Sequence, residues 1–570
     1  MTSDPSRIPL DRLSWARWVR AIRDFTGSEV GGRARLLFGA LLGLLLAING
    51  LNVVNSYVGR DFMTAIERQS MSGFIGMGLL YIGVFAVSTL VAVIYRFAEE
   101  RLGLLWRHWL TRRLVERYLD GATYYRLRER AELANPDQRI TDDVRTFTAT
   151  TLSLTLVLLN TTFTILAFSG VMWSISPLLF LVAVAYAALG SGLTIAFGRP
   201  LIWLSYNQSD REASLRSELV HLRENAESVA FLRREGRLRA RILGSVDELV
   251  ANMKRIIGVN RNLGFFTTGY NYLIQIIPIL IVAPLFIRGK AEFGVISQSS
   301  MAFSHLIGAF SLIITQFQQI SSYAVVLARL SALAEGVERA EAHDGSRIAI
   351  EETAAALEYE RLTLRSPQDG RVLIDGLSGS VPPGTRTLVE GPNQAGRIAL
   401  FRATAGLWDA GEGRIVRPPV EEVLLLTERP YLPPGTLRQA LLRTGREAAL
   451  GDEPILAVLR ALGVESVLER AGGLDEERDW DDLLSLAEQQ SLSVARLVLA
   501  APRFALLDRP GTVLDADAVA GALDLLADRS ITVVTFAADM ALAAHHDARL
   551  ELASDGTWTW EPIRKEGAAA

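Results

Sequence analysis

The chain has 570 residues and a formal net charge of −4, with 59 Lys and Arg against 63 Asp and Glu. This near-neutral charge argues against a nucleic-acid partner, and the absence of cysteine excludes disulfides, thiolate metal sites and cysteine nucleophiles. A length of about 150 residues per domain predicts two to four units. Because the mean hydropathy is positive, at +0.23, while 21% of the residues are charged, we expect apolar spans joined to a charged soluble part.

The N-terminal segment, 1–35, is polar and basic, and the apolar run after it is too long for the h-region of a cleaved signal peptide. Six stretches without Asp, Glu, Lys or Arg follow, each long enough at about 20 residues to cross a bilayer. An ionised side chain near the middle of a span costs about 2.5–3.5 kcal/mol. We therefore predict six transmembrane helices in a lipid bilayer; the alternative is buried helices of a soluble protein. The six predicted spans are 36–58, 73–95, 152–173, 177–198, 266–287 and 294–317.

The two long connections, 96–150 and 199–265, carry Arg at close intervals, whereas the alternate connections carry few basic residues. Because positive charge stays on the cytoplasmic side, both termini are expected in the cytoplasm. The long connections are expected to be helical extensions of the spans.

The predicted membrane domain covers 36–334 and ends in a polar linker at 335–347. An α/β domain is predicted at 348–562, followed by a short tail at 563–570. The prediction rests on strand-like runs that alternate with helical patterns, at 371–374, 423–426, 504–507 and 531–536.

The segment that begins at Gly391, GPNQAGRIALFRATAGLW, has the frame of a phosphate-binding loop but little of its chemistry. In a working loop of the pattern G-x-x-x-x-G-K-[ST], backbone N–H groups surround phosphates, the Lys contacts the β and γ oxygens, and the hydroxyl binds Mg²⁺. Gly391 and Gly396 keep this frame, while Arg397 and Ile398 fill the Lys and Ser/Thr positions. Ile398 has no oxygen for a hard cation, so Mg²⁺ loses a ligand.

Together with four later segments, this loop resembles the nucleotide-binding domain of ABC transporters. The five ordered matches cover 350–550 and imply the ABC-type α/β fold. The four segments resemble, in chain order, the Q-loop region, the signature helix, the Walker B strand with its D-loop, and the strand that ends at the switch histidine: LLLTERPYLPPGTLRQAL, LLSLAEQQSLSVARLVLA, FALLDRPGTVLD and ITVVTFAADM.

The resemblance shows which hydrolytic groups are missing. Glu428 stands where a Gln orients Mg²⁺ and water, and Arg509 stands at the general-base position after Asp508, although Arg cannot accept a proton from water. Asp508 and Asp515 match retained positions, and Ser485 survives from the signature. The remaining departures add bulk to the cradle, replace the signature glycines or remove the switch histidine, at Gln394, Leu486, Ala487 and Ala538.

We therefore expect a pseudo-ATPase with no catalytic residue, no metal site and no required cofactor. The general base, the metal hydroxyl and the switch are lost together, and these groups supply most of the stabilisation of phosphoryl transfer. ATP binding is expected to be weak or absent. Residual nucleotide or polyphosphate binding through Arg397 stays open, as does the alternative that these residues are ordinary surface and core positions.

Most of 100–330 resembles the SbmA/BacA-like family and its relatives among the peroxisomal-type, subfamily D, ABC transporters. The resemblance implies a type IV ABC exporter-like dimer of six-helix halves around one aqueous path, with peptides and other water-soluble molecules among the cargoes. Some members lack a nucleotide-binding domain and are driven by the proton gradient. The matching segments are WRHWLTRRLVERYLDGATYYRL, NPDQRITDDVRTFT, EASLRSELVHLRENAESVAFLRREGR and GYNYLIQIIPILIVAPLFIRGKAEFG.

Two polar features lie inside the predicted spans. Asn49, Asn52 and Asn55 recur every three residues and share one helix face, which would either line water or make interhelical hydrogen bonds. His305 is the one titratable Asp, Glu, Lys, Arg or His side chain in the six windows, and a histidine changes charge near neutral pH. It is either a proton-linked switch or a neutral, hydrogen-bonded histidine.

Charged residues outside the spans supply further candidates. Glu212, Glu224 and Glu227 lie near Arg216 and Arg223 at helical spacing, where they would form a gate, a contact that transmits motion, or a solvated helix face. Glu292, in the last outer connection, is a candidate proton acceptor.

The leading hypothesis is a bacterial inner-membrane homodimer that moves small peptides or other hydrophilic solutes with the proton gradient. The first alternative is the regulatory half of a heterodimer with an intact ABC half-transporter. That reading is weakened because the signature that would face the partner also lacks its glycines. The second alternative is a membrane receptor or scaffold without transport activity.

Overall fold

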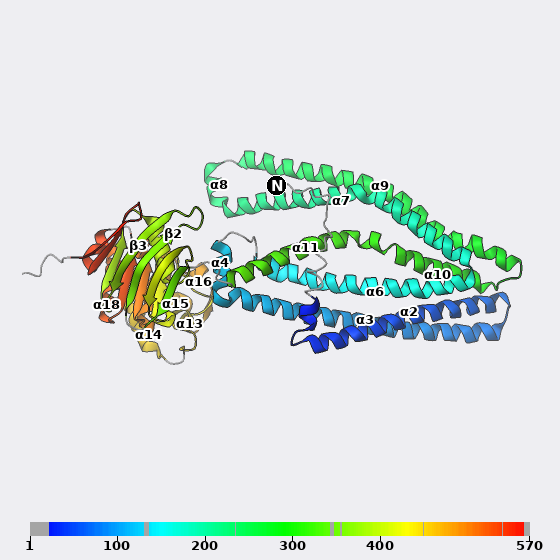
Figure 1. Cartoon of the computed structure of the whole chain (residues 1–570), viewed down its shortest axis with the longest axis horizontal. Helices are drawn as coiled ribbons and strands as arrows, with labels where there is room; N and C mark the ends of the chain where they lie inside the picture. Colours follow the sequence, from blue (N-terminus) through cyan, green and yellow to red (C-terminus); the bar gives the residue numbers. More distant parts are fainter. Residues whose placement is uncertain are drawn as a thin grey trace, which may run out of the picture. The chain divides into compact units, whose positions relative to one another are not determined.

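The structure is a computed structural model that describes residues 22–129, 136–233, 235–341, 347–353, 356–447, 450–537 and 540–563. The chain divides into two compact units, Met1–Glu338 and Arg339–Ala570, which we call the helical unit and the α/β unit (Figure 1). The division falls in the segment expected to be a linker. Helix α11 (Leu312–Glu341) continues through 335–341, so the first part of that segment is helical.

Long helices make up the helical unit (Figure 1). Within it α2 packs against α3, α7 packs against α9, and α10 contacts α2, α6 and α9. A π-helical segment, η2 (Arg139–Asp143), precedes α6. The other helices are α2 (Gly31–Glu67), α3 (Met71–Leu119), η1 (Asp120–Ala122), α4 (Thr123–Glu129), α5 (Pro136–Gln138), α6 (Val144–Ile175), α7 (Pro177–Glu224), α8 (Ala226–Leu232), α9 (Glu235–Ile287) and α10 (Gly294–Phe310).

Five helical stretches of the described residues are long and apolar enough to cross a membrane. They contain the first five predicted windows: Gly31–Glu67, Met71–Arg128, Pro136–Ile175, Pro177–Glu224 and Glu235–Ile287. The sixth window, 294–317, falls on α10 and the start of α11, which are separated by a helix break at Ser311. The helical membrane region is therefore confirmed, while the count of six spans stays a prediction.

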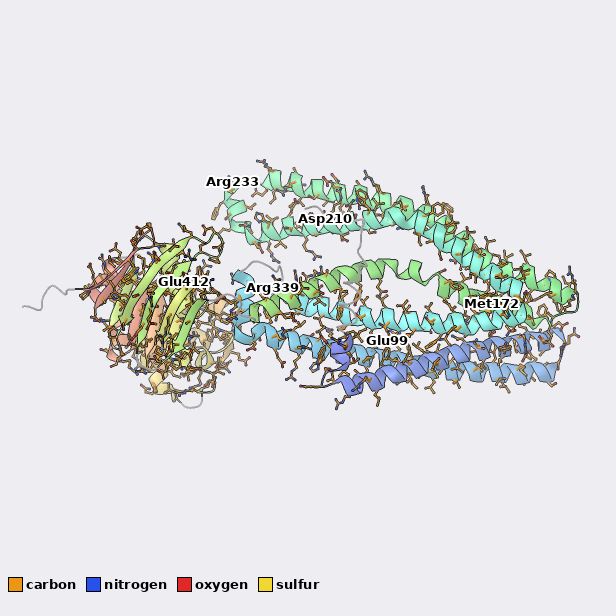
Figure 2. All side chains as sticks on the ribbon, viewed as in Figure 1. Glu99, Met172, Asp210, Arg233, Arg339 and Glu412 are labelled. Atoms are coloured by element: carbon orange, nitrogen blue, oxygen red, sulfur yellow. The ribbon has the colours of Figure 1, made fainter. Side chains whose placement is uncertain are left out.

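Where the structure describes them, the long connections are largely helical extensions, as expected. Helix α3 has 49 residues and is about 70 Å long at 1.5 Å per residue, well over the roughly 30 Å of bilayer hydrocarbon. Figure 2 shows Met172, in α6, near one end of the helical unit and Arg233, after α8, at the other. The charged parts of α3, α7 and α9 can therefore extend far beyond an apolar layer.

The turn between α6 and α7 is encoded locally. Ser176 has an extended backbone and its side chain accepts a hydrogen bond from the Leu179 N–H, while Pro177 occupies the first turn of α7. Proline suits this position because its missing N–H would have no helical partner there. The two helices can thus reverse direction with one intervening residue.

Two main sheets build the α/β unit. The six-stranded sheet has the order β12-β11-β4-β10-β9-β6 and is parallel except for β12, and the four-stranded sheet has the order β1-β5-β2-β3. The strands are β1 (Arg347–Glu352), β2 (Leu357–Arg365), β3 (Val372–Val381), β4 (Arg386–Glu390), β5 (Gly411–Arg417), β6 (Val423–Leu426), β7 (Gly435–Thr436), β8 (Glu477–Arg478), β9 (Phe504–Asp508), β10 (Thr532–Phe536), β11 (Ala548–Leu552) and β12 (Trp558–Pro562).

Alternation along the central strands produces two apolar cores. Leu507 and Val533 belong to one core, and their neighbours Leu506 and Val534 belong to the other, because successive side chains of a strand point to opposite faces. The α/β fold class is confirmed. The helices are α12 (Gln394–Thr404), η3 (Val420–Glu422), α13 (Leu437–Leu441), α14 (Asp452–Ala461), α15 (Glu465–Ala471), α16 (Trp480–Leu483), α17 (Leu486–Ala500), η4 (Pro510–Thr512), α18 (Ala516–Asp528) and η5 (Met540–His545).

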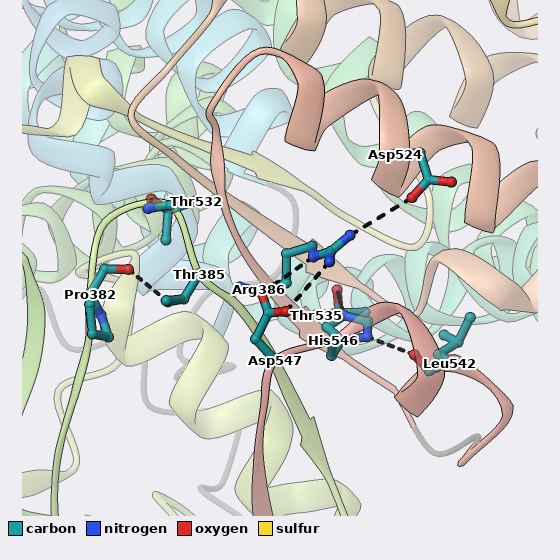
Figure 3. A network of polar contacts seen from close by, with 10 residues as sticks. Pro382, Thr385, Arg386, Asp524, Thr532, Thr535, Leu542, His546 and Asp547 are labelled. Atoms are coloured by element: carbon teal, nitrogen blue, oxygen red, sulfur yellow. Dashed lines mark hydrogen bonds and ion pairs between the residues drawn. The ribbon is translucent and has the colours of Figure 1, made fainter. Parts of the chain in front are cut away.

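A polar network connects β4 to the segment before β11 (Figure 3). The Arg386 guanidinium lies 3.4 Å from an Asp547 carboxylate oxygen and 3.8 Å from Asp524. The neighbouring His546 is fully buried, with Nδ1 2.7 Å from the Leu542 carbonyl oxygen and Nε2 2.9 Å from the Thr535 hydroxyl. Both ring nitrogens have partners, and burial lowers the pKa of His546.

Candidate functional site

The phosphate-loop frame lies between β4 and α12. Gly391 has φ +110°, and a Cβ atom there would lie 2.4 Å from the Leu552 carbonyl oxygen, so glycine is required. The Asn393 side chain caps α12 by accepting the Gly396 N–H at 2.8 Å and donates to the Leu373 carbonyl oxygen at 2.7 Å. The loop is therefore held by backbone geometry and by a cap that sequence reasoning did not single out.

The cation position of the loop is turned inward. Arg397 is 6% exposed, and its Nη1 donates a hydrogen bond to the Gly391 carbonyl oxygen at the start of the same loop. Burial lowers the pKa of Arg397, and the charge of nearby Arg509 adds to this effect. Ile398 is half-buried and Gln394 is exposed. The side chain in the Lys position therefore forms its hydrogen bond with the backbone of the loop itself.

Arg509 lies between two carboxylates. Strands β6 and β9 are parallel neighbours, with Leu426 opposite Leu507, so the residues that follow both strands emerge at one sheet edge. There the Arg509 Nη2 forms an ion pair with the Glu428 carboxylate, and its Nε lies 3.4 Å from Asp508 Oδ1. Burial raises the pKa of Asp508, against the opposing effect of the Arg509 charge.

The backbone of Arg509 is held in an unusual conformation. Its φ of +49° lies in the left-handed region, and its N–H donates to the Phe536 carbonyl oxygen at 2.8 Å. This contact joins the residue after β9 to the end of β10. Backbone strain of this kind persists where the surroundings hold it in place.

The signature serine is part of a helix cap. Ser485 and Glu488 form a capping box at the start of α17, in which the Glu488 carboxylate accepts the Ser485 N–H at 2.9 Å. Leu486 and Ala487 form the first turn. The S-x-x-E spacing is the sequence signal for this cap. Asp515 likewise caps α18 by accepting the Ala518 N–H at 2.8 Å.

The residues at this edge do not fit a magnesium nucleotide complex. Mg²⁺ requires oxygen ligands, but the side chain of Ile398 supplies none, and both nearby carboxylates are paired with Arg509. The Arg509 side chain cannot act as a general base, because its guanidinium does not accept a proton from water. Ala538, predicted to replace the switch histidine, lies outside the described residues. The structure brings Arg509, Glu428 and Asp508 together, near Arg397.

The asparagine stripe of α2 begins in a hydrogen-bonded network. Asn49 is 3% exposed; its Nδ2 donates to Asn160 Oδ1 at 2.9 Å, and its Oδ1 accepts from the Thr164 hydroxyl at 2.7 Å. Both partners belong to α6. Asn49 thus adopts the interhelical alternative rather than facing water.

Further along α2 some buried polar atoms have no hydrogen-bond partner within the described residues. Asn52 and Asn55 are half-buried. Among the residues that the structure describes, Asn55 Oδ1, Ser56 Oγ and Gln298 Nε2 are buried without a hydrogen-bond partner. Ser56 and Gln298 belong to the packed helices α2 and α10. This end of the stripe keeps unused hydrogen-bonding capacity, which a solute or water would satisfy.

The remaining membrane-unit candidates do not gather into one site. His305 stacks on Phe168 with ring centroids 4.5 Å apart, and Glu292 forms an ion pair with Arg68 at 2.8 Å. Glu212 accepts a hydrogen bond from Gln208 at 3.1 Å. Within the described chain, no ion pair joins the three predicted loop glutamates to Arg216 or Arg223. The ion pairs of this hairpin instead join α7 to α9, as Arg211 with Glu248 and Arg241 with Glu218.

A half-buried ion pair in the helical unit has no signal in the sequence. Asp143, at the end of the π-helical segment, accepts two hydrogen bonds from the Arg329 guanidinium of α11, at 2.6 and 2.8 Å. The Asp143 side chain is 4% exposed. No spacing in the sequence links these residues, although π-helical segments recur at functional sites.

Membrane-length helices joined to an α/β unit with a strand–loop–helix phosphate-loop frame define a half-transporter of the ABC type. The family model described as "ABC transporter transmembrane region 2" matches residues 25–287. An uncharacterized ABC transporter ATP-binding protein of Synechocystis is 36% identical over 93% of this chain and 82% of its own length. The chain belongs to the ABC transporter family, among half-transporters of the subfamily D type.

Two further relatives show the breadth of this similarity. The chloroplastic ABC transporter D family member 2 of Arabidopsis thaliana is 33% identical over 95% of this chain and 86% of its own length. The human protein named lysosomal cobalamin transporter ABCD4 is 25% identical over 93% of each chain. Both span the helical and the α/β units.

Proposed function

We propose that the chain is a transporter of the SbmA/BacA type whose α/β unit does not hydrolyse ATP. The observation that carries the proposal is the pairing of Arg509 with Glu428 and Asp508, together with the Arg397 bond to the Gly391 carbonyl oxygen. In these contacts, the charged side chains that would bind a magnesium–nucleotide complex are instead bound within the protein. With no hydroxyl at Ile398 and no base at Arg509, phosphoryl transfer lacks its main sources of stabilisation.

The energy source follows from this loss. Uphill transport without hydrolysis can be driven by an ion gradient, and His305 is a protonatable group within the predicted spans. Its ring is half-buried and stacked on Phe168. We therefore propose proton-driven transport at a bacterial inner membrane, with both termini in the cytoplasm.

The proposed cargo is a small peptide or another hydrophilic solute. The open polar atoms of Asn55 and Gln298 support a wet path, since an apolar solute would leave them unsatisfied. We propose a homodimer because one six-helix half does not enclose a path for a sizeable solute. Partnership with an intact half-transporter would instead give ATP-dependent uptake, and a non-transporting receptor would give none.

Reconstitution of the purified chain tests the proposal. Vesicles receive a pH gradient with or without ATP, and proton movement and peptide uptake are followed together with phosphate release. The expected result is gradient-driven uptake that is lost in His305→Ala and retained in His108→Ala, an exposed histidine of α3 outside the predicted span. ATP turnover by the contaminant-free chain that Asp508→Asn abolishes would refute the proposal.

A further inference from the structure

We infer that Arg509 is a built-in cation that replaces a divalent metal ion between Glu428 and Asp508, so that the α/β unit is assembled without metal. The inference rests on the proposed function, because it concerns the same site. It adds that the two carboxylates are retained as partners of a side chain, and that they would bind a divalent ion if that side chain were removed.

The topology brings two carboxylates together at this place. Glu428 follows β6 and Asp508 ends β9, and these strands are parallel neighbours at the edge of the sheet. Their side chains are only 29% and 18% exposed. Two carboxylates that share such a site repel each other unless a cation lies between them or a proton neutralises one.

In this structure the Arg509 guanidinium is the cation between them. Its Nη2 forms an ion pair with Glu428, and its Nε lies 3.4 Å from Asp508 Oδ1 without making a hydrogen bond, so that one planar cation lies between two carboxylates. The hydrogen bond from its N–H to Phe536 holds the backbone at φ +49°. The cation is therefore tethered between β9 and β10 and cannot be removed by a chelator.

The same arrangement excludes a divalent ion. The carboxylates that Mg²⁺ or Mn²⁺ would use are bound to Arg509, and Arg397 adds a second positive charge nearby. Like charges repel more strongly in a partly buried site than in water. A phosphate ligand would then approach this edge as a metal-free anion.

Metal binding to the full-length chain in nanodiscs tests the inference, with Mn²⁺ as the probe and electron paramagnetic resonance as the readout. In Arg509→Gln both carboxylates lose this cation, and we expect Mn²⁺ affinity to rise roughly tenfold or more, since carboxylate oxygens are its preferred ligands. Arg361→Gln is the matched control, because Arg361 is an exposed arginine of the same unit with φ +44°. The control should equal the wild type, and Arg509→Gln combined with Glu428→Gln should lose the gain.

Two results would contradict the inference. A folded Arg509→Gln variant that binds no more Mn²⁺ than the control would overturn the inference. A second measurement does not depend on any variant: in the full-length wild-type chain, the unfolding midpoint of the α/β unit should be the same in EDTA and in excess Mg²⁺, within about 1 °C, because a ligand that does not bind the native state does not stabilise it. Stabilisation by Mg²⁺ alone would also overturn it.

The two proposals fail in different ways. ATP turnover by the wild-type chain would refute the proposed function. Absence of an Mn²⁺ gain in Arg509→Gln, with the wild type still inactive toward ATP, would refute only the role of Arg509 as a substitute cation.

Discussion

Polar groups are satisfied differently in the two units. In the helical unit, Asn49 is bonded to Asn160 and Thr164, so its network is neutral. In the α/β unit, Arg509 holds Glu428 and Asp508 in a charged network at a half-exposed edge. In the sequence, both groups of residues are of types that bind ligands. In the structure, both groups are bound by other residues of the same chain. A residue of ligand-binding type is therefore a weaker indicator of a ligand than its unused hydrogen-bonding capacity.

Arg329→Met tests whether the helical unit also depends on a charged pair, and we expect the largest effect here. The change leaves the Asp143 carboxylate buried without its cation, which should lower the free energy of unfolding by about 3 kcal/mol. The measurement is reversible unfolding of the purified chain by SDS titration. Adding Asp143→Asn should recover part of the loss. An Arg329→Met chain as stable as the wild type would show that the pair carries no stability.

Asn49→Leu tests the neutral network. It removes two interhelical hydrogen bonds, and we expect a loss of about 1–2 kcal/mol in the same titration. Asn52→Leu is the matched control on the same helix, since Asn52 is half-buried and makes none of these bonds; it should change stability by less than about 0.5 kcal/mol. Equal losses in both variants would contradict the distinction between the two ends of the stripe.

The pH dependence of the α/β unit depends on His546. Burial lowers the pKa of this histidine in the folded state, so the unfolded chain binds its proton first as the pH falls below about 6.5. Stability from the neutral ring is complete above that pH and is lost as the pH falls toward the folded pKa, by no more than about 1.4 kcal/mol for each pH unit. Urea midpoints between pH 7.5 and 5.5 measure this loss.

His546→Gln should flatten that pH dependence, whereas His545→Gln should leave it unchanged. His545 is the adjacent histidine and is half-buried rather than fully buried. A wild-type midpoint that rises as the pH falls would contradict the sign of the prediction.

Ser485→Ala gives the smallest expected effect. If the serine now serves its own helix, loss of the capping box should destabilise α17 by about 1 kcal/mol, measured by hydrogen exchange of α17 peptides. Ser491→Ala, within the same helix, is the control and should stay within about 0.5 kcal/mol of the wild type. If amide exchange in α17 is unchanged in Ser485→Ala, the capping box does not stabilise the helix.

Strands of the α/β unit were the part of the fold that could be predicted most closely. The run 423–426 coincides with β6, and 504–507 lies within β9, because continuous apolar residues mark strands buried on both faces. The run 371–374 reaches only the start of β3, which continues to Val381 through alternating and small residues. The break at Ser311 was not predicted, since the window 294–317 is uniformly free of charge.

By itself the sequence determined which chemistry the chain carries: charge-free windows long enough to span a bilayer, a loop with Gly391 and Gly396 in place, and no oxygen at Ile398. These are properties of single residues and of local spacing. Only the tertiary structure decided that Arg509 pairs with Glu428 and that Arg329 binds Asp143. The reason is that an ion pair requires two charged groups within about 4 Å, and for residues far apart in the chain that distance is set by strand order and helix packing.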